Sequence, residues 1–201
     1  MQAVGVAAIV LAAGASSRFG RPKTLAYLWG RPLLLYVLDA VAAVGIEEVL
    51  VVLGQDAEEI ERSLPWRSER RVRNPEPQAG LSSSLRVGLE NVSPARDAAL
   101  VLLGDQPLVR VDVIERLLAE PGSTERPIVV PRYRDGGGSN PVLVGRSAWQ
   151  LAREARSDRG LGPILRMHPD LVTVLDFDGS NPDIDTPDEL AAIEAVPGIR
   201  P

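Results

Sequence analysis

Residues 6–23 are VAAIVLAAGASSRFGRPK, a continuous apolar run that ends in a loop rich in glycine, serine and basic residues. An unbroken apolar run of this length is expected of a central strand that is buried on both faces of a parallel sheet. Open α/β sheets bind their ligands at the loops that leave the carboxyl ends of such strands. The loop that follows the first strand is therefore expected to lie at a ligand site.

Strand-like and helix-like patterns alternate along the remainder of the chain. Between Pro32 and Val44 apolar residues recur at helical spacing, and Gly45 follows the last of them. Further strands are expected at 48–53, near 72, and at 98–103, 128–130, 141–144 and 171–177, and further helices at 56–64, 83–91, 112–120, near 147, near 164 and at 188–196. This alternation predicts a three-layer α/β/α fold around a doubly wound, mostly parallel sheet. The length predicts a single domain, residues 1–201.

The composition limits the kinds of partner and cofactor. A net charge of -5 gives no general attraction to nucleic acid or to anionic lipid, so neither is an expected partner. The chain has no cysteine and one histidine, His168, which leaves oxygen atoms as metal ligands and favours magnesium. The first apolar run lacks a basic leader and is too short to span a bilayer, so a cytoplasmic location is expected.

The first loop has the chemistry of a polyphosphate site. Gly14 allows backbone N–H groups to approach a phosphate closely, and Arg18, Arg21 and Lys23 place three cations in one loop of an acidic protein. The spacing fits neither a Walker A loop nor a dinucleotide fingerprint. The structural alternative is a tight turn at Gly14 with solvated cations.

Two carboxylates could hold a metal ion beside that loop. Asp105 follows the apolar strand 98–103, and Asp185 lies in the segment NPDIDTPDE, residues 181–189. Two carboxylates together with substrate oxygens are a usual magnesium arrangement. The alternatives are that Asp105 caps the next helix and that the Asp-Thr-Pro-Asp-Glu segment only starts one. Asp183 is either a supporting group or a turn residue.

A glycine and serine segment, residues 80–85, begins a further helix. Its free N–H groups could contact a base, a ribose or phosphates. The alternative is an ordinary serine cap of the helix.

Across nearly the whole chain these motifs resemble, in the same order, those of the nucleotidyltransferases of molybdenum-cofactor maturation. Their first loop has the signature L-A-(A/G)-G-x-S-x-R-x-G-x-x-K, which matches this chain at every fixed position from Leu11 to Lys23. Ala13 stands where the cytidylyltransferase branch has alanine and the guanylyltransferases have glycine. The resemblance implies the Rossmann-like fold of the nucleotide-diphospho-sugar transferases. It also implies transfer of CMP from CTP to the terminal phosphate of molybdenum-bound molybdopterin, with Mg²⁺, or alternatively Mn²⁺, as the metal.

The resemblance also implies roles for particular residues. Arg18, Lys23, Asp105 and Asp185 would be catalytic, and the two aspartates would be the metal ligands. Nucleotide contacts are implied at Leu11, Ala12, Ala13, Gly14, Ser16, Ser17, Arg18, Lys23, Asn74, Gly80, Ser82, Ser84 and Gly104. Acceptor contacts are implied at Gln106, Asn140, Pro141, Asp158 and Gly160.

The chain departs from the family pattern on the acceptor side. Asn140 stands in place of a histidine, and Ser157 stands in place of a glycine. Asn140 keeps its hydrogen-bonding capacity but loses any role of an imidazole, so the acceptor could differ. His168 has no motif around it and is expected to be structural.

Other activities remain open from the sequence. Within the same fold the rivals are a guanylyltransferase that uses GTP and a cytidylyltransferase that acts on a sugar phosphate or an alcohol phosphate. A nucleotide-binding oxidoreductase is disfavoured because the G-x-G-x-x-G pattern is absent. A carrier that delivers the pterin to a molybdoenzyme without turnover is the third alternative, and a molybdoenzyme could also receive the product of the transferase.

Overall fold

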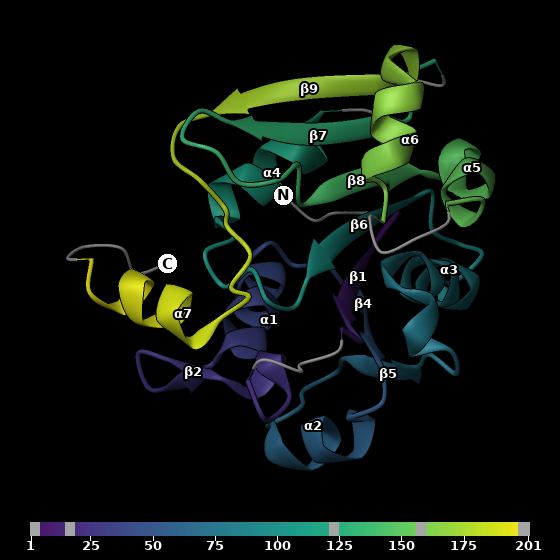
Figure 1. The fold of residues 1–201 in the computed structure, drawn as a ribbon. Helices are drawn as coiled ribbons and strands as arrows, with labels where there is room; N and C mark the ends of the chain where they lie inside the picture. Colours follow the sequence, from purple (N-terminus) through teal and green to yellow (C-terminus); the bar gives the residue numbers. More distant parts are fainter. Residues whose placement is uncertain (1–4, 15–18, 121–124, 156–159, 197–201) are drawn as a thin grey trace.

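The computed structural model describes residues 5–14, 19–120, 125–155 and 160–196. A seven-stranded sheet in the order β5-β4-β1-β6-β8-β7-β9 forms its centre (Figure 1). The strands are β1 Val6–Ala12, β4 Glu48–Leu53, β5 Arg70–Arg73, β6 Ala98–Leu103, β7 Ile128–Tyr133, β8 Val142–Gly145 and β9 Val172–Phe177. Only β8, among these seven, runs antiparallel to its neighbours β6 and β7. The prediction of a mostly parallel sheet is therefore confirmed.

Helices cover both faces of this sheet. Three pack on one face, α1 Leu33–Ala43, α2 Ala57–Ser63 and α4 Val111–Ala119, and three on the other, α3 Leu81–Asn91, α5 Trp149–Arg153 and α6 Gly162–Met167. The side chains of β1 alternate between the two cores: Ala8 and Val10 lie with α1, whereas Ala7 and Ile9 lie with α3. This arrangement confirms the predicted three layers.

A small third core lies at one edge of the molecule. The helix α7, Pro187–Glu194, lies near a two-stranded hairpin, β2 Tyr27–Leu28 and β3 Arg31–Pro32, which the sequence did not predict. Leu190 and Ile193 of α7 pack against a cluster of buried residues, Ala26, Leu28, Leu33 and Ile184. Four short 3₁₀ turns complete the described elements: η1 Lys23–Leu25, η2 Pro77–Ala79, η3 Arg146–Ala148 and η4 Pro169–Leu171.

The order of the strands places a ligand crevice beside β1. The chain passes from β1 to β4 and β5 on one side, and then returns to add β6 on the other side of β1. Such a reversal opens a crevice at the carboxyl ends of the two strands that flank it. The loops that follow β1 and β6 both leave from this point.

Neither α3 nor α2 has a side-chain cap. The helix α3 begins at Leu81, earlier than expected, and its N-cap is Gly80 with a φ of 87°, so no serine caps it. Asp56 precedes α2, but its side chain makes no capping hydrogen bond. In contrast, α1 begins after Pro32 and ends before Gly45, close to the predicted limits.

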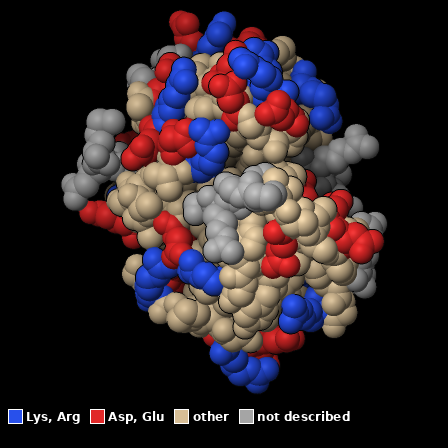
Figure 2. Space-filling model, turned by 90° about the vertical axis from the view of Figure 1, so that its left-hand side faces the viewer, with Lys and Arg blue, Asp and Glu red and all other residues tan. Residues whose placement is uncertain are grey.

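The far end of the sheet carries mixed charge. Figure 2 shows basic and acidic side chains interspersed over the upper part of one face, where β7 and β9 lie. Arg132 pairs with Asp176 across these strands, and Arg134 pairs with Asp178. Exposed pairs of this kind contribute little to stability. Among the described residues, no helix has the length and apolar character needed to cross a bilayer.

Close packing of α3 on β1 yields a prediction. A Cβ atom at Gly88 would lie 2.6 Å from Cγ2 of the fully buried Ile9. Gly88→Ala should therefore lower the free energy of unfolding by about 1–2 kcal/mol, because overpacking outweighs the helix propensity of alanine. Urea denaturation measures this, with the exposed Glu90→Ala as a control that stays within about 0.5 kcal/mol of the parent. Unchanged stability of Gly88→Ala would show that α3 can move away from the sheet.

Candidate functional site

A cleft of about 470 Å³ opens at the crevice beside β1. Its walls come from four parts of the chain: the first loop, the segment that leads into α3, the end of β6, and the segment before α7. The lining residues are Leu11, Ala13, Gly14, Pro77, Gln78, Gly80, Leu81, Ser84, Leu103, Asp105, Asp183 and Asp185. Predicted nucleotide contacts and both predicted metal ligands therefore share one cleft.

An ion triad of Lys23, Asp105 and Asp185 lies at this cleft. The ammonium nitrogen of Lys23 lies 2.8 Å from Oδ1 of Asp185 and also pairs with Oδ2 of Asp105. The exposed fractions of the three side chains are 15% for Lys23, 21% for Asp105 and 54% for Asp185. Two carboxylates that are 80 positions apart in the sequence thus meet at one cation.

The carboxylates fix the charge of Lys23. Burial of its side chain by itself lowers the pKa, but the charge of Asp105 and hydrogen bonds to Asp105 and Asp185 outweigh burial. The net effect is a pKa above the ordinary value for lysine. The side chain of Lys23 therefore carries a positive charge throughout the physiological pH range.

Backbone geometry brings Asp185 to the end of β6. The backbone N–H of Ile184 donates to the carbonyl of Asp105 at 3.2 Å, and the Ile184 side chain is 0% exposed in the third core. Successive residues of an extended chain face opposite ways, so burial of Ile184 leaves Asp183 and Asp185 facing the cleft. Next, Thr186 and Glu189 form a capping box that starts α7. The segment is therefore both a helix start and a source of cleft carboxylates.

Gln106 braces this segment from within the protein. It is 2% exposed, and its amide donates to Oδ1 of Asp183 at 2.8 Å and to the carbonyl of Asn181 at 3.3 Å. The Asn181 amide donates in return to Gln106 and also to the carbonyl of Asn140. The side-chain oxygen of Asn181 is buried and has no partner among the described residues. The polar groups of Gln106 are thus occupied within the protein, away from the cleft wall where an acceptor contact was expected.

The folded protein disfavours the ionised form of Asp183. Partial removal from water raises its pKa, and the nearby charges of Asp105 and Asp185 raise it further. The Gln106 amide and Lys23 oppose that rise only in part. Ionised Asp183 therefore costs stability in the folded protein.

The wall formed by α3 is held by Asn74. This buried amide donates to the hydroxyls of Ser83 and Ser84 at 2.8 and 3.0 Å, and its oxygen accepts from the backbone of Glu76. Ser82 is 2% exposed and lies behind the wall. Ser84 and Gly80 border the cleft, whereas Asn74 and Ser82 support it.

The remaining predicted residues have mixed placements. Ala12 and Gly104 pack on each other: a Cβ at Gly104 would lie 3.1 Å from that of Ala12. Pro141 is buried, and buried Gly160 packs behind the cleft residue Leu81. Ser16, Ser17, Arg18 and Asp158 lie outside the described residues, as does Ser157.

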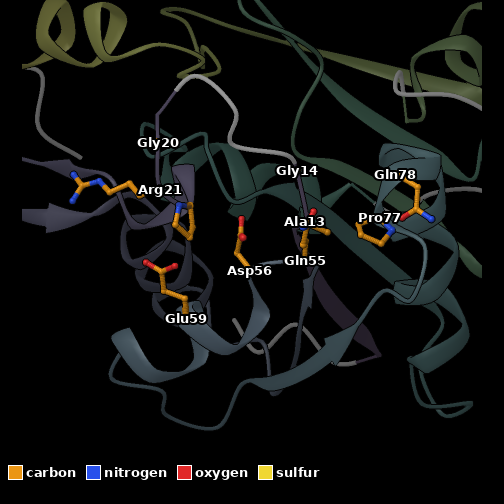
Figure 3. A pocket seen from close by; sticks show the side chains of 10 residues that line it. Ala13, Gly14, Gly20, Arg21, Gln55, Asp56, Glu59, Pro77 and Gln78 are labelled. Carbon is orange, nitrogen blue, oxygen red and sulfur yellow. The ribbon is translucent and has the colours of Figure 1, made fainter.

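A second cleft adjoins the first and shares Ala13, Gly14, Pro77 and Gln78 with it (Figure 3). It has a volume of about 500 Å³ and is bordered by Asp56 and Glu59. Arg21 also borders it, but its guanidinium extends away from Asp56 in Figure 3 and lies over the ring of Tyr27. The sequence did not single out this acidic cleft.

The donor set of the first cleft fits a divalent cation. Asp105 and Asp185 already converge on one positive charge, and both present carboxylate oxygens, the ligands that magnesium prefers. Among the described residues, no group of three or more His, Asp or Glu side chains forms a fuller ligand set. Magnesium commonly takes one or two carboxylates and completes its shell with phosphate oxygens and water. The two aspartates match that pattern.

Sequence comparison matches residues 8–172 to the model of the MobA-like NTP transferase domain. This span includes Lys23 and Asp105, whereas Asp185 lies beyond it. Among curated proteins, the Bifunctional protein GlmU of Sorangium cellulosum is 34% identical over 173 residues, which are 82% of this chain and 32% of that protein. The chain thus spans about a third of the length of this relative.

Solved structures share the fold over nearly the full chain. Rv0371c from Mycobacterium tuberculosis is 28% identical with a TM-score of 0.85, covering 97% of this chain and 100% of that one. A structure of Rv0371c in complex with manganese is also similar, with a TM-score of 0.82. A nucleotidyl transferase from Methanothermobacter is 25% identical with a TM-score of 0.77, covering 94% of this chain and 95% of that one.

The raised pKa of Asp183 predicts how stability depends on pH. Because the folded pKa lies above the ordinary value of 3.8, the ionised carboxylate destabilises the fold at neutral pH, and the cost disappears below that value. Asp183→Asn should raise the melting temperature at pH 7 by at most about 4 °C, since solvent in the cleft screens the charge. The gain should vanish at pH 3.5. Calorimetry at both pH values measures this, with the exposed Asp178→Asn as control, and a loss of stability at pH 7 would contradict it.

Proposed function

The chain belongs to the MobA-like NTP transferase domain family, and we propose that it transfers CMP from CTP to the terminal phosphate of molybdenum-bound molybdopterin. Pyrophosphate would be the second product. A molybdoenzyme would then receive the cytosine dinucleotide cofactor.

One observation supports this proposal above the others. The Lys23, Asp105 and Asp185 triad lies at a cleft that is also lined by Gly14 of the first loop. A nucleoside triphosphate needs cations for its phosphates, a metal site and a small-residue loop that its phosphates can approach. The cleft and the triad beside it offer a cation, two carboxylates and a small-residue loop, which supports the proposal.

The chemistry requires no nucleophile from the protein. An oxygen of the acceptor phosphate attacks the α-phosphorus of CTP, a new P–O bond forms, and the bond between the α-phosphorus and the bridging oxygen breaks as pyrophosphate leaves. Lys23, with Arg18, would neutralise charge on the leaving group. Asp105 and Asp185 would hold Mg²⁺ or Mn²⁺, which when bound would offset the same charge.

The choice of cytosine rests on Ala13. Its methyl group stands at the cleft, in the position where the resemblance associates alanine with cytidylyltransferases and glycine with guanylyltransferases. Backbone groups of Leu11 to Gly14, together with Gly80 and Ser84 opposite, would contact the nucleotide. Asn74, Ser82, Ala12 and Gly104 would hold these walls in place.

Asn140 favours a second candidate, cytidylyl transfer to another small phosphorylated acceptor. The family pattern has histidine at this position, and an asparagine cannot exchange a proton as an imidazole does. The Asn140 carbonyl already accepts from Tyr133 and Asn181, so the backbone here is fixed. Asp158 and Gly160 would then shape the acceptor side for a different ligand, and Gln106 would support it from within the protein.

A panel of substrates tests the function. The protein is incubated with Mg²⁺, each of the four nucleoside triphosphates, and either molybdenum-bound molybdopterin or a set of sugar and alcohol phosphates. We expect pyrophosphate release with CTP and the pterin, and a cytosine dinucleotide in the mass spectrum. Turnover with GTP alone would overturn the base assignment. Turnover only with another phosphate would establish the second candidate, and no turnover with any pair would overturn the transferase proposal.

The metal ligands give a mutational prediction. Asp105→Asn and Asp185→Asn should each lower the rate of transfer roughly 100-fold or more, because each removes a charged ligand while preserving side-chain volume. Circular dichroism should show an intact fold. Asp178→Asn, which alters an exposed carboxylate that pairs with Arg134, is the matched control and should retain full activity. Normal rates in both active-site variants would remove the proposed metal role.

A further inference from the structure

Lys23 occupies the place that the proposed function gives to a metal ion. Its ammonium contacts both carboxylates that would hold the divalent cation. We propose that Lys23 is an exchangeable counter-ion, which neutralises Asp105 and Asp185 until the nucleotide polyphosphate draws its ammonium away and the divalent cation replaces it. This inference rests on the proposed function, since it assumes that these two aspartates are the metal ligands.

Lys23 compensates the negative charges of Asp105 and Asp185. Asp105 and Asp185 bring two negative charges to one point, and Asp183 lies near enough to raise the local negative potential. Like charges at such distances repel strongly where water is partly excluded. The ammonium of Lys23, 15% exposed, offsets that repulsion. The two carboxylates can therefore remain converged in the absence of any other cation.

The same contacts imply that Lys23 and a divalent cation compete for the two carboxylates. Carboxylate oxygens that face an ammonium cannot fully face a divalent cation, and the two positive charges also repel each other. Divalent cation alone should therefore bind weakly to this site. A polyphosphate provides the alternative partner for Lys23, because its charge exceeds that of one carboxylate. Metal and nucleotide binding should consequently reinforce each other, and this coupling is reciprocal.

The local backbone allows the side chain to move on its own. Lys23 begins the turn η1, in which Leu25 donates to the carbonyl of Pro22 and Ala26 donates to that of Lys23, each at 2.9 Å. Thr24 and Leu25 are buried, so the turn is anchored. The four-carbon stem of lysine has several rotatable bonds. An exchange of partners therefore needs only a new rotamer of Lys23, with no refolding of the loop.

Binding of Mn²⁺ without nucleotide tests the inference. Free Mn²⁺ is measured by electron paramagnetic resonance during titration of the full chain, its Lys23→Met variant and its Lys23→Arg variant. Lys23→Met removes the charge and keeps an unbranched side chain, and it should bind Mn²⁺ about tenfold more tightly or better. Lys23→Arg retains the charge and should bind as weakly as the parent. Arg21→Met, which removes a neighbouring cation that does not contact these aspartates, is the matched control and should leave the affinity unchanged.

Thermal denaturation provides a second measurement, which compares the stability of the parent and of Lys23→Met with and without Mn²⁺. Without metal, Lys23→Met should melt below the parent, because Asp105 and Asp185 then repel each other unopposed. Saturating Mn²⁺ should raise its melting temperature more than that of the parent, since binding to the folded state stabilises it. An equal increase in both proteins would overturn the inference.

Two further variants separate this inference from the proposed function. Asp105→Asn and Asp185→Asn should each weaken Mn²⁺ binding in the parent and in the Lys23→Met background. If they do so while Lys23→Met binds no more tightly than the parent, the counter-ion role is overturned and the metal site stands. If neither aspartate variant changes the affinity, the metal assignment in the proposed function fails.

Discussion

The convergence of Asp105 and Asp185 on the ammonium of Lys23 is the interaction on which the architecture of the site depends. Two carboxylates are stable side by side only when a cation compensates them, and the partners must be held by rigid elements for the geometry to persist. Here the supports are the end of a central strand, a buried 3₁₀ turn and an extended segment pinned to that strand by a backbone hydrogen bond. The parallel sheet supplies the rest, because it delivers the loops after β1 and β6 to one edge.

Burial of one apolar residue sets the direction of two acidic ones. Ile184 is fully buried beside Leu28 and Leu33, and its neighbours in the sequence face the cleft as a consequence. Gln106 adds a second restraint from the opposite side, since its amide holds Asp183 and the backbone of Asn181. Polar groups that are satisfied inside a protein act as such restraints because moving them would leave them unpaired. The buried side chains of Ile184 and Gln106 therefore set the positions of the cleft carboxylates.

Much of the fold could be predicted because it follows from local patterns in the sequence. Unbroken apolar runs indicate buried parallel strands, and Pro32 and Gly45 mark the ends of α1. The direction of β8 could not be predicted, because the run Val142–Val144 is equally apolar in either direction. The role of Gln106 could not be predicted either. Its hydrogen-bond partner Asn181 lies 75 positions away in the sequence. A glutamine beside Asp105 therefore resembled a ligand-binding group. The alternative of a serine cap for α3 is wrong, because Gly80 at positive φ starts the helix without one.

Electrostatics also distinguishes the two clefts that meet at Gly14. One is lined by Asp105 and Asp185, the partners of Lys23, whereas the other is bordered by Asp56 and Glu59. The side chain of Arg21 lies over Tyr27, and in the described part of the chain no ion pair joins it to those acids. A polyphosphate would be attracted where a lysine can exchange its carboxylate partners for phosphate oxygens. The ion pairs of Lys23 therefore distinguish the cleft that is lined by Asp105 and Asp185 from its neighbour.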